Sequence, residues 1–512
     1  MAETLRDVVL RGRRFGDRIA VRAGEHERSH ADLVDRASRL ARHLLESGLV
    51  PGDRVAAMVE DGLRSLEPHL AAALAGLVVV PVNARFRTAE LDHVLRDCGA
   101  RALVHSSGVA TVVAASDLAS QLDLVLDTGG SGALDIAAAY ESVVSKGPVD
   151  LPDVPIEPDD IAMIGYTSGT TGHPKGAVMT HAAGLAGVRA NLVAFRVVPY
   201  GSCAFSGSVS FTALLWAMIY PHLYVGCSLD MLQPDLTVER WFDRMLEHGS
   251  TFTFVPTPYL DDFAAEALRR PEAVQRLTGV CHSASPATSA QREAMAAALG
   301  PVSLESYGMT ETLAAVTVTT TLDLCPESQA DDPFTTIGRP LPPADVYPVD
   351  PQGRRVGPGE IGELVVESPS LFAGYWERAE ATAEALREGR LHTGDLGHVD
   401  EQGFLYVDGR KVDLIISGGM NVYPAEVERV LHTHPDIVEV AVIGLPHSRW
   451  GESVCAVVVP REGSALTRED VVAHARAHLA SYKKPTRVEL VPALPRNANL
   501  KIQKADLRAR LS

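Results

Sequence analysis

The spacing of apolar and polar residues predicts a chain in which helices and strands alternate. Residues 31–48 carry apolar side chains at helical spacing and finish at Gly48, a residue that suits the end of a helix. Residues 52–61 then have the pattern of a strand, and in residues 70–82 small helix-forming residues run into a valine-rich, buried strand. This alternation is typical of a layered α/β architecture, and no internal repeat is visible.

The pattern changes near residues 408–412, which predicts a domain boundary. Residues 397–410 just before it resemble a short hairpin, and after it we expect a compact α+β unit of about one hundred residues. The expected elements of this unit are a helix over 424–434, strands near 437–444 and 452–460, a helix over 467–479 and a strand near 486–491. An acidic, proline-rich stretch over 148–160 reads as a surface connector.

Composition narrows the class of protein. The net charge of −18 argues against non-specific binding of nucleic acid. The six cysteines form no CxxC pair, so they predict neither a zinc site nor a disulfide framework, and reduced thiols fit a cytoplasmic location. The N-terminus lacks the apolar segment of a signal peptide, and the longest apolar runs, near 70–82 and 211–220, are too short to span a bilayer.

The segment 166–176 (YTSGTTGHPKG) is the strongest chemical signal in the chain. It holds three glycines, four Ser or Thr hydroxyls and one lysine in eleven positions. Glycines allow backbone amides to approach an anion closely, and the hydroxyls and Lys175 add donors and positive charge, so the loop suits a polyphosphate. It is not a P-loop, because the spacing GxxxxGK[ST] is absent. The alternative is a flexible surface loop without a ligand.

Further motifs follow in a fixed order to the end of the chain. With the segment 166–176, they resemble the adenylate-forming superfamily of acyl-CoA synthetases, peptide-synthetase adenylation domains and luciferases, and acyl-CoA synthetases most of all. The matching segments are Ser283-Ala284-Ser285-Pro286, Tyr307-Gly308-Met309-Thr310-Glu311, Gly338-Arg339-Pro340, Gly362-Glu363-Leu364, Gly374-Tyr375, Thr393-Gly394-Asp395, Gly409-Arg410, residues 416–419, residues 424–428 and Lys501. An ordered set of motifs is far more specific than any one of them.

The resemblance implies an α/β fold with two domains. The larger, residues 1–409, would be an AMP-binding domain of several subdomains with layered sheets and helices. The smaller, residues 410–512, would be a mobile α+β domain that carries the catalytic lysine. The implied reaction joins a carboxylate to the α-phosphorus of ATP, releases pyrophosphate, and passes the acyl group from the acyl-adenylate to the thiol of coenzyme A.

The resemblance also assigns roles to residues that bind nucleotide. The residues implied to hold the β- and γ-phosphates are Thr167, Ser168, Gly169, Thr170, Thr171, Gly172 and Lys175. Tyr307 would stack on adenine, Asp395 would accept both ribose hydroxyls, and Arg410 would approach the same ribose. The other residues implied to contact ATP or AMP are Ser283, Ala284, Ser285, Glu305, Ser306 and Gly308.

Catalysis is expected to depend on charge, because the first step brings one anion to another. Lys501 would bridge the substrate carboxylate and the α-phosphate, and Thr310 would donate to that phosphate. Glu311 and Thr167 are the candidate Mg²⁺ ligands, since a hard cation takes carboxylate and hydroxyl oxygens and keeps phosphates as its other ligands.

The remaining implied residues concern the acid, the thiol and the domain movement. Gly207 and Tyr259 would line the acid pocket, and Gly207 stands where many acyl-CoA synthetases carry His, which predicts room for a bulky, hydrophobic or cyclic acid. Gly418 and Gly419 would offer backbone to the pantetheine arm. Lys483 and Lys484 could meet the phosphates of coenzyme A, although paired lysines are usually only solvated. Val412 occupies the hinge position, where Asp or Lys is usual.

Two departures leave an alternative open. Val412 is stiffer than the usual hinge residues, and Leu500 replaces the glycine that usually precedes the catalytic lysine. An enzyme specialised for adenylation, which leaves the thioester step to a partner ligase or carrier protein in trans, is therefore a second hypothesis. With no carrier domain recognised in residues 1–512, we expect any carrier protein to act in trans. A non-catalytic nucleotide-binding protein is a third. The sequence leaves the oligomeric state open, with a homodimer as one candidate.

Overall fold

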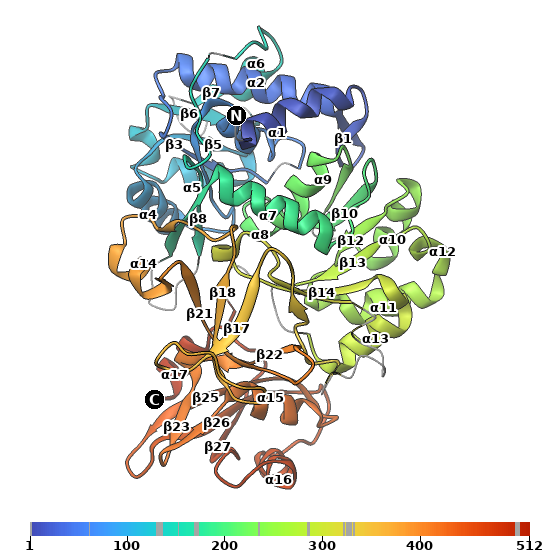
Figure 1. Ribbon diagram of the computed structural model, residues 1–512, viewed down its shortest axis with the longest axis vertical. Helices are drawn as coiled ribbons and strands as arrows, with labels where there is room; N and C mark the ends of the chain where they lie inside the picture. The colour runs from blue at the N-terminus through green and yellow to red at the C-terminus, as the bar shows by residue number, and fades with distance from the viewer. Residues whose placement is uncertain are drawn as a thin grey trace.

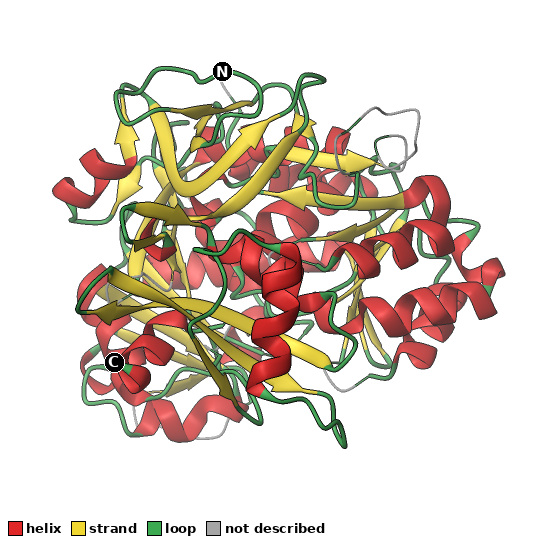
Figure 2. Ribbon diagram, turned by 90° about the horizontal axis from the view of Figure 1, so that it is seen from below, coloured by secondary structure: helices red, strands yellow, loops and turns green. Residues whose placement is uncertain are grey.

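A computed structural model shows the predicted α/β architecture, with layers of strands flanked by helices (Figures 1 and 2). It describes residues 3–60, 62–129, 137–151, 153–167, 174–233, 236–283, 287–320, 323, 330, 333–496 and 502–512. The expected fold class, a large part with layered sheets followed by a smaller α+β part, is confirmed. The domain boundary at residues 409 and 410 and the mobility of the smaller part stay predictions.

Within the described residues, the first large sheet has nine strands and is mostly parallel. Its order is β16 (Arg339–Pro340), β15 (Thr317–Thr320), β14 (Ser303–Tyr307), β13 (Gly279–His282), β12 (Phe252–Phe254), β10 (Ser202–Ser206), β11 (Ser228–Leu232), β1 (Ile19–Ala23) and β2 (His26–Ser29). The strands from β14 to β1 run parallel to one another. The segments after β10 and β14 therefore leave the sheet at one edge.

The second large sheet has eight strands among the described residues. Its order is β19 (Gly374–Tyr375), β9 (Lys175–Thr180), β8 (Ile161–Thr167), β4 (Val78–Pro81), β3 (Arg54–Met58), β5 (Ala100–His105), β6 (Leu124–Asp127) and β7 (Ala137–Ala139). All of β4 is buried, as its run of valines predicts for a central strand. The antiparallel hairpin of β8 and β9 carries the glycine-rich segment between its strands.

Two smaller sheets follow in the chain. One joins β17 (Asp345–Val349), β18 (Gly362–Glu367), β20 (Leu386–Arg387), β21 (Arg390–Val399) and β22 (Leu405–Arg410). The other joins β23 (Ile415–Ser417), β24 (Met420–Val422), β25 (Ile437–His447), β26 (Gly451–Pro460) and β27 (Arg487–Leu490), and lies at the lower end of Figure 1. The predicted hairpin over 397–410 is formed by the end of β21, the turn that follows it, and β22, which pairs with β21 in antiparallel fashion.

Helices cover these sheets. They are α1 (Leu5–Arg11), α2 (His30–Glu46), α3 (Glu67–Ala75), α4 (Thr88–Cys98), α5 (Ala110–Ala114), α6 (Tyr140–Val144), α7 (His181–Ala194), α8 (Thr212–Leu214), α9 (Tyr220–Tyr224), α10 (Val238–Glu247), α11 (Leu260–Arg269), α12 (Pro271–Val274), α13 (Ser289–Leu299), α14 (Ala379–Ala385), α15 (Pro424–His432), α16 (Arg468–His478) and α17 (Lys504–Leu511). A π-helical turn over Leu215–Ile219 joins α8 to α9.

Local sequence explains where several helices begin. The hydroxyl of Ser29 accepts a hydrogen bond from the Asp32 amide at the start of α2, and the hydroxyl of Thr180 accepts one from the Ala183 amide at the start of α7. These caps satisfy backbone donors that the first turn of a helix leaves unpaired. The Thr180 cap makes β9 pass directly into α7, which anchors one end of the hairpin that carries the predicted phosphate loop.

Candidate active site

Tyr307, Asp395 and Arg410 form one cluster although 103 positions separate the first from the last. Tyr307 ends β14, and Asp395 and Arg410 face each other across β21 and β22. The Tyr307 hydroxyl donates to Oδ2 of Asp395 at 2.7 Å, and Nε of Arg410 donates to Oδ1 at 2.7 Å. The structure thus brings together three residues that the sequence assigned to the adenosine part of the nucleotide.

Electrostatics keep this cluster in one protonation state. Burial, together with the nearby Asp395 carboxylate, raises the pKa of Tyr307 well above its usual value, so the phenol stays a donor. Burial lowers the pKa of Arg410, but the attraction of Asp395 and Tyr307 more than offsets this, and its pKa is raised. Asp395 is only 4% exposed and presents two carboxylate oxygens, which can accept hydrogen bonds from two neighbouring hydroxyls of a ribose.

Glu311, Tyr375 and Lys175 form a second cluster. The Tyr375 hydroxyl donates to Oε1 of Glu311 at 2.8 Å, and Nζ of Lys175 lies 5.4 Å from the centre of the Tyr375 ring. Glu311 also contributes to the raised pKa of Arg410, which places the two clusters within electrostatic reach of each other. The candidate metal carboxylate and the lysine of the predicted phosphate loop therefore share one neighbour.

Other predicted residues have partners of their own. Thr167 and Lys175 are paired in register at the base of the β8–β9 hairpin. The hydroxyl of Thr310 lies 3.5 Å from that of Thr212 at the start of α8. Ser283 donates to the carbonyl oxygen of Ser306 at 2.9 Å, which ties the segment after β13 to β14.

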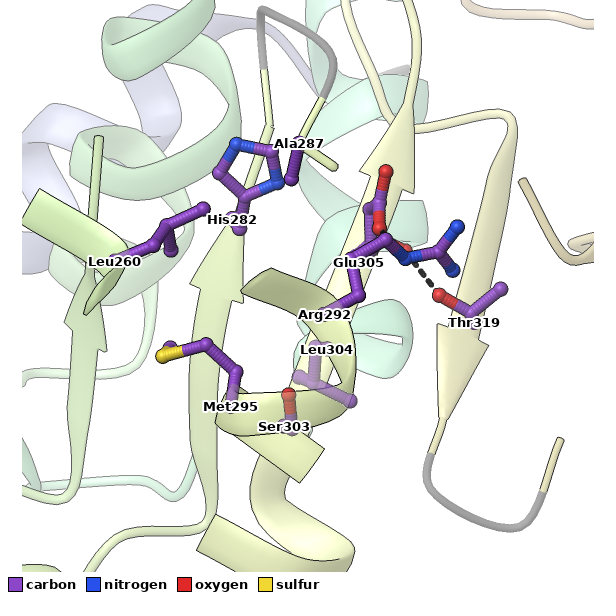
Figure 3. Close-up of a pocket in the computed structure, with 9 residues that line it drawn as sticks. All are labelled: Leu260, His282, Ala287, Arg292, Met295, Ser303, Leu304, Glu305 and Thr319. Carbon is purple, nitrogen blue, oxygen red and sulfur yellow. Dashed lines mark hydrogen bonds and ion pairs between the residues drawn. The ribbon is translucent and has the colours of Figure 1, made fainter. Parts of the chain in front are cut away.

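Glu305 on β14 is held by Arg292 rather than facing open solvent. Figure 3 shows the Arg292 side chain reaching from α13 toward Glu305, beside a small cavity that His282 and Met295 also line. Arg292 is ion-paired with Glu305 and donates to the carbonyl oxygens of Phe334 and Thr336. The cavity is about 20 Å³, enough for roughly one water molecule, so it is no pocket for a nucleotide or an acid.

Gly207 and Tyr259 are the predicted acid-pocket residues. Gly207 follows β10, is exposed, and has φ +154°, a conformation that L side chains rarely adopt. A Cβ at this position would lie 2.4 Å from Cδ1 of Leu214, so Leu214 fills part of the room that the missing side chain was expected to open. Tyr259 is half-buried and packs edge-on against Trp241, with ring centres 6.2 Å apart.

The residues predicted for the thiol and the hinge lie in the C-terminal sheet region. Gly418 and Gly419 are the two central residues of the β23–β24 turn, with φ +61° and +82°. A two-residue turn of this kind needs glycine for its own geometry, so the turn explains both residues without a ligand. Val412 is 60% exposed, as a hinge residue can be, and Lys483 is ion-paired with Glu426 at 2.6 Å.

Several predicted site residues lie outside the described residues. They are Lys501, Leu500, Ala284, Ser285, Ser168, Gly169, Thr170, Thr171 and Gly172. Their roles stay predictions. The described residues that flank Lys501 are close together, since Arg496 and Ile502 form an antiparallel bridge and the Gln503 amide donates to the Pro495 carbonyl oxygen at 2.8 Å.

Comparison with known proteins identifies the family. A family model described as AMP-binding enzyme matches residues 9–376, and a model described as the AMP-binding enzyme C-terminal domain matches residues 426–501. The chain belongs to the AMP-binding enzyme family. The predicted resemblance to adenylate-forming enzymes is thereby confirmed.

Individual relatives cover nearly the whole of this AMP-binding enzyme. It is 37% identical over 505 residues to a feruloyl-CoA synthase from an Amycolatopsis species, with 98% of each chain covered. It is 34% identical to the 2-succinylbenzoate–CoA ligase of Geobacillus kaustophilus, covering 96% of this chain and 95% of the relative. The crystal structure of ATP-bound MatB from Rhodopseudomonas palustris superposes with a TM-score of 0.88 at 29% identity, covering 99% of both chains.

The protein is an AMP-forming acid–thiol ligase. It activates a carboxylic acid with ATP, releases pyrophosphate, and forms a thioester from the acyl-adenylate and coenzyme A. The non-catalytic and adenylation-only alternatives are less well supported. That the Tyr307–Asp395–Arg410 cluster binds the ribose and that Lys175 binds phosphate oxygens stay predictions, with which the hydrogen-bonding groups and the positive charge are compatible. The chemistry is mainly one of positioning and charge neutralisation.

A divalent cation fits this site as a companion of the nucleotide. Among the described residues, no group of three or more His, Cys, Asp or Glu side chains could form a metal cage by itself. Glu311 offers one carboxylate, which suits a Mg²⁺ ion that takes most of its other ligands from phosphates and water. Bound there, the ion would neutralise phosphate charge during adenylation.

Sequence reasoning missed two residues that support the site. Tyr375 was recognised only as part of the Gly374-Tyr375 motif, and the sequence around it does not indicate a hydrogen bond to Glu311. Arg292 lies on α13 and carries no motif signal, yet it is the partner of Glu305. Among the described residues, no helix is both long enough and apolar enough to cross a membrane.

Proposed function

We propose that this ligase acts on a carboxylic acid that contains an aromatic ring, with Mg²⁺ accompanying ATP, and that it works in the cytoplasm. The observation that carries the proposal is that two relatives covering nearly the whole chain are named for such acids, ferulate and 2-succinylbenzoate. The cytoplasmic location is supported by the cysteines: those in the described residues are buried and unpaired, as in a reducing compartment.

The local chain beside the expected acid site is apolar, which supports a hydrophobic substrate. Gly207 follows β10 without a side chain, and the nearest group to its missing Cβ is the methyl of Leu214, an apolar atom. A ring gains affinity from contact with such apolar surface, whereas acetate offers too little area to gain much. The site is therefore better suited to an apolar ring than to a short polar acid.

The proposal is tested by a screen for pyrophosphate release. Aromatic, fatty and polycyclic acids are compared with acetate, each with and without coenzyme A. We expect an aromatic acid to give the highest kcat/KM and its CoA thioester to accumulate only when coenzyme A is present. Acetate or a saturated fatty acid as the best substrate would contradict the proposed acid class.

Replacing Gly207 by His tests the role of the missing side chain. We expect Gly207→His to lower kcat/KM for the best aromatic acid at least about tenfold more than for acetate, because the imidazole takes volume beside the acid. Gly207→Ala is the matched control, since it meets the same positive φ and the same contact with Leu214 but adds no ring. Equal losses for both acids in Gly207→His would mean that the position does not discriminate by size.

The exposure of Val412 predicts that this hinge residue does not limit the thioester step. With 60% of its surface exposed, Val412 makes few contacts that a domain rotation would have to break. We expect Val412→Asp to change the rate of thioester formation from preformed acyl-adenylate by less than about threefold. Single-turnover kinetics with coenzyme A measure this rate. An acceleration of tenfold or more would favour the adenylation-specialised alternative.

A further inference from the structure

Tyr375 occupies an unusual place between two parts of the site. It lies in β19, a two-residue strand at the edge of the eight-stranded sheet, and pairs with Ala177 of β9. β9 begins at Lys175, so the strand that ends the predicted phosphate loop is fixed directly beside Tyr375. The backbone of Tyr375 is thus built into the base of that loop.

The side chain of Tyr375 reaches in another direction, to Glu311. Its hydroxyl donates to Oε1 at 2.8 Å, and the amide of Phe372 donates to the Glu311 carbonyl oxygen at 2.8 Å. One short segment therefore holds both the backbone and the carboxylate of Glu311. In the part of the chain that the structure describes, the carboxylate has no other hydrogen bond or ion pair, so Oε2 is left to a ligand.

The ring of Tyr375 supports the lysine of the loop. Nζ of Lys175 lies 5.4 Å from the ring centre, within the range of an attraction between a cation and an aromatic face. The hydroxyl and the ring of one side chain thus contact a carboxylate and an ammonium group, the two kinds of group that receive a metal ion and its polyphosphate.

We propose that Tyr375 is a positioning residue for the complex of a divalent cation with a nucleoside triphosphate. Its hydroxyl fixes one oxygen of Glu311 so that the other is presented to the cation, and its ring holds Lys175 beside the phosphates. Tyr375 itself touches neither reacting atom. The inference concerns the nucleotide alone and does not depend on which acid the enzyme activates.

The test is the binding of Mn²⁺, in place of Mg²⁺, in the presence of a non-hydrolysable α,β-methylene analogue of ATP. Free Mn²⁺ is measured by electron paramagnetic resonance, without acid or coenzyme A. We expect Tyr375→Phe, which keeps the ring and removes the hydroxyl, to weaken Mn²⁺ binding by about tenfold, the usual effect of one hydrogen bond to a charged group.

Tyr347→Phe is the matched control. Tyr347 donates to the carboxylate of Glu367 between β17 and β18, so this variant also removes a tyrosine–glutamate hydrogen bond but has no contact with Glu311 or Lys175. It should leave Mn²⁺ affinity unchanged. Unchanged Mn²⁺ affinity in Tyr375→Phe, or an equal loss in both variants, would overturn the proposal.

A double-mutant cycle separates positioning from a general loss of structure. Glu311→Asp withdraws the carboxylate from the Tyr375 hydroxyl while it keeps the charge. If the hydroxyl acts only through Glu311, adding Tyr375→Phe to Glu311→Asp should weaken Mn²⁺ binding by less than twofold further. Fully additive losses would contradict the proposal. Because no acid is present, a failed acid screen leaves this result unaffected.

Discussion

Replacement of Lys501 by Met is expected to slow acyl-adenylate formation by about 10²-fold or more, the usual effect of losing one preorganised electrostatic contact in a transition state. The substrate carboxylate and the α-phosphate repel each other until a cation lies between them, and Lys501 is the predicted source of that charge. Thioester formation from a supplied acyl-adenylate should change much less, because the anhydride has already formed.

The two half-reactions can be measured separately in single turnovers. Pyrophosphate release reports adenylation, and thioester release from synthetic acyl-adenylate reports the second step. Lys504→Met is a matched control, because Lys504 lies three positions further on and is ion-paired with Glu428 at 2.7 Å. It should retain adenylation within a few-fold. Equal losses of both half-reactions in Lys501→Met would contradict this division of labour.

Acidification to pH 5.5 is expected to destabilise the fold strongly. Burial lowers the pKa of His30, His69, His181, His222 and His282 from the ordinary value of 6.5 to about 4. The rings are at most 5% exposed. In His69, Nδ1 lies 3.0 Å from the Ser65 carbonyl oxygen and Nε2 is buried with no partner among the described residues, so a second proton would be buried unpaired.

The sign follows from the protons that each state binds. The unfolded chain protonates these rings as the pH falls through about 6.5, whereas the folded chain does so only near pH 4, so the unfolded state binds more protons in between. From pH 7.5 to 5.5 each ring should cost a little more than ~1 kcal/mol of unfolding free energy, and the five together about 6 to 7 kcal/mol. Hydrogen bonds from Arg36 lower the pKa of Glu141 to about 2, so its contribution is lost only below this window.

Denaturant unfolding at pH 7.5, 6.5 and 5.5 measures this effect. His69→Gln should reduce the slope of stability against pH, since one of the buried rings no longer contributes. His26→Gln is the control, because His26 is exposed at the start of β2 and should leave the slope unchanged. Stability that stays level or rises between pH 7.5 and 5.5 would contradict the account.

Much of the fold could be predicted where the spacing of apolar residues matches the face that a helix or strand buries. The helix expected over 31–48 is α2, and the buried strand expected at the end of 70–82 is β4. The C-terminal elements were also placed within a few residues, because their apolar faces form one small core. Helix α17 was not predicted, because it is short, only half of its residues are apolar, and it depends on contacts with distant residues, including the ion pair of Arg508 with Asp413.

Site residues could be predicted only where they belong to a sequence motif of the family. Tyr307, Asp395 and Arg410 were assigned from their motifs, and the structure places them in contact. The hydrogen bond from Tyr375 to Glu311 joins residues 64 positions apart. Its formation depends on how two sheets pack, which no local sequence pattern indicates. Gly418 and Gly419 show the opposite case, since a tight turn explains them without the ligand that the resemblance implied.

The most direct test of the central claim is a single-turnover reaction with the best aromatic acid, ATP and coenzyme A, quenched and analysed for products. The account predicts that acyl-adenylate and pyrophosphate appear first, and that AMP and the aromatic acyl-CoA then replace the adenylate. ADP in place of AMP and pyrophosphate, or no acid-dependent use of ATP with any aromatic acid, would contradict it.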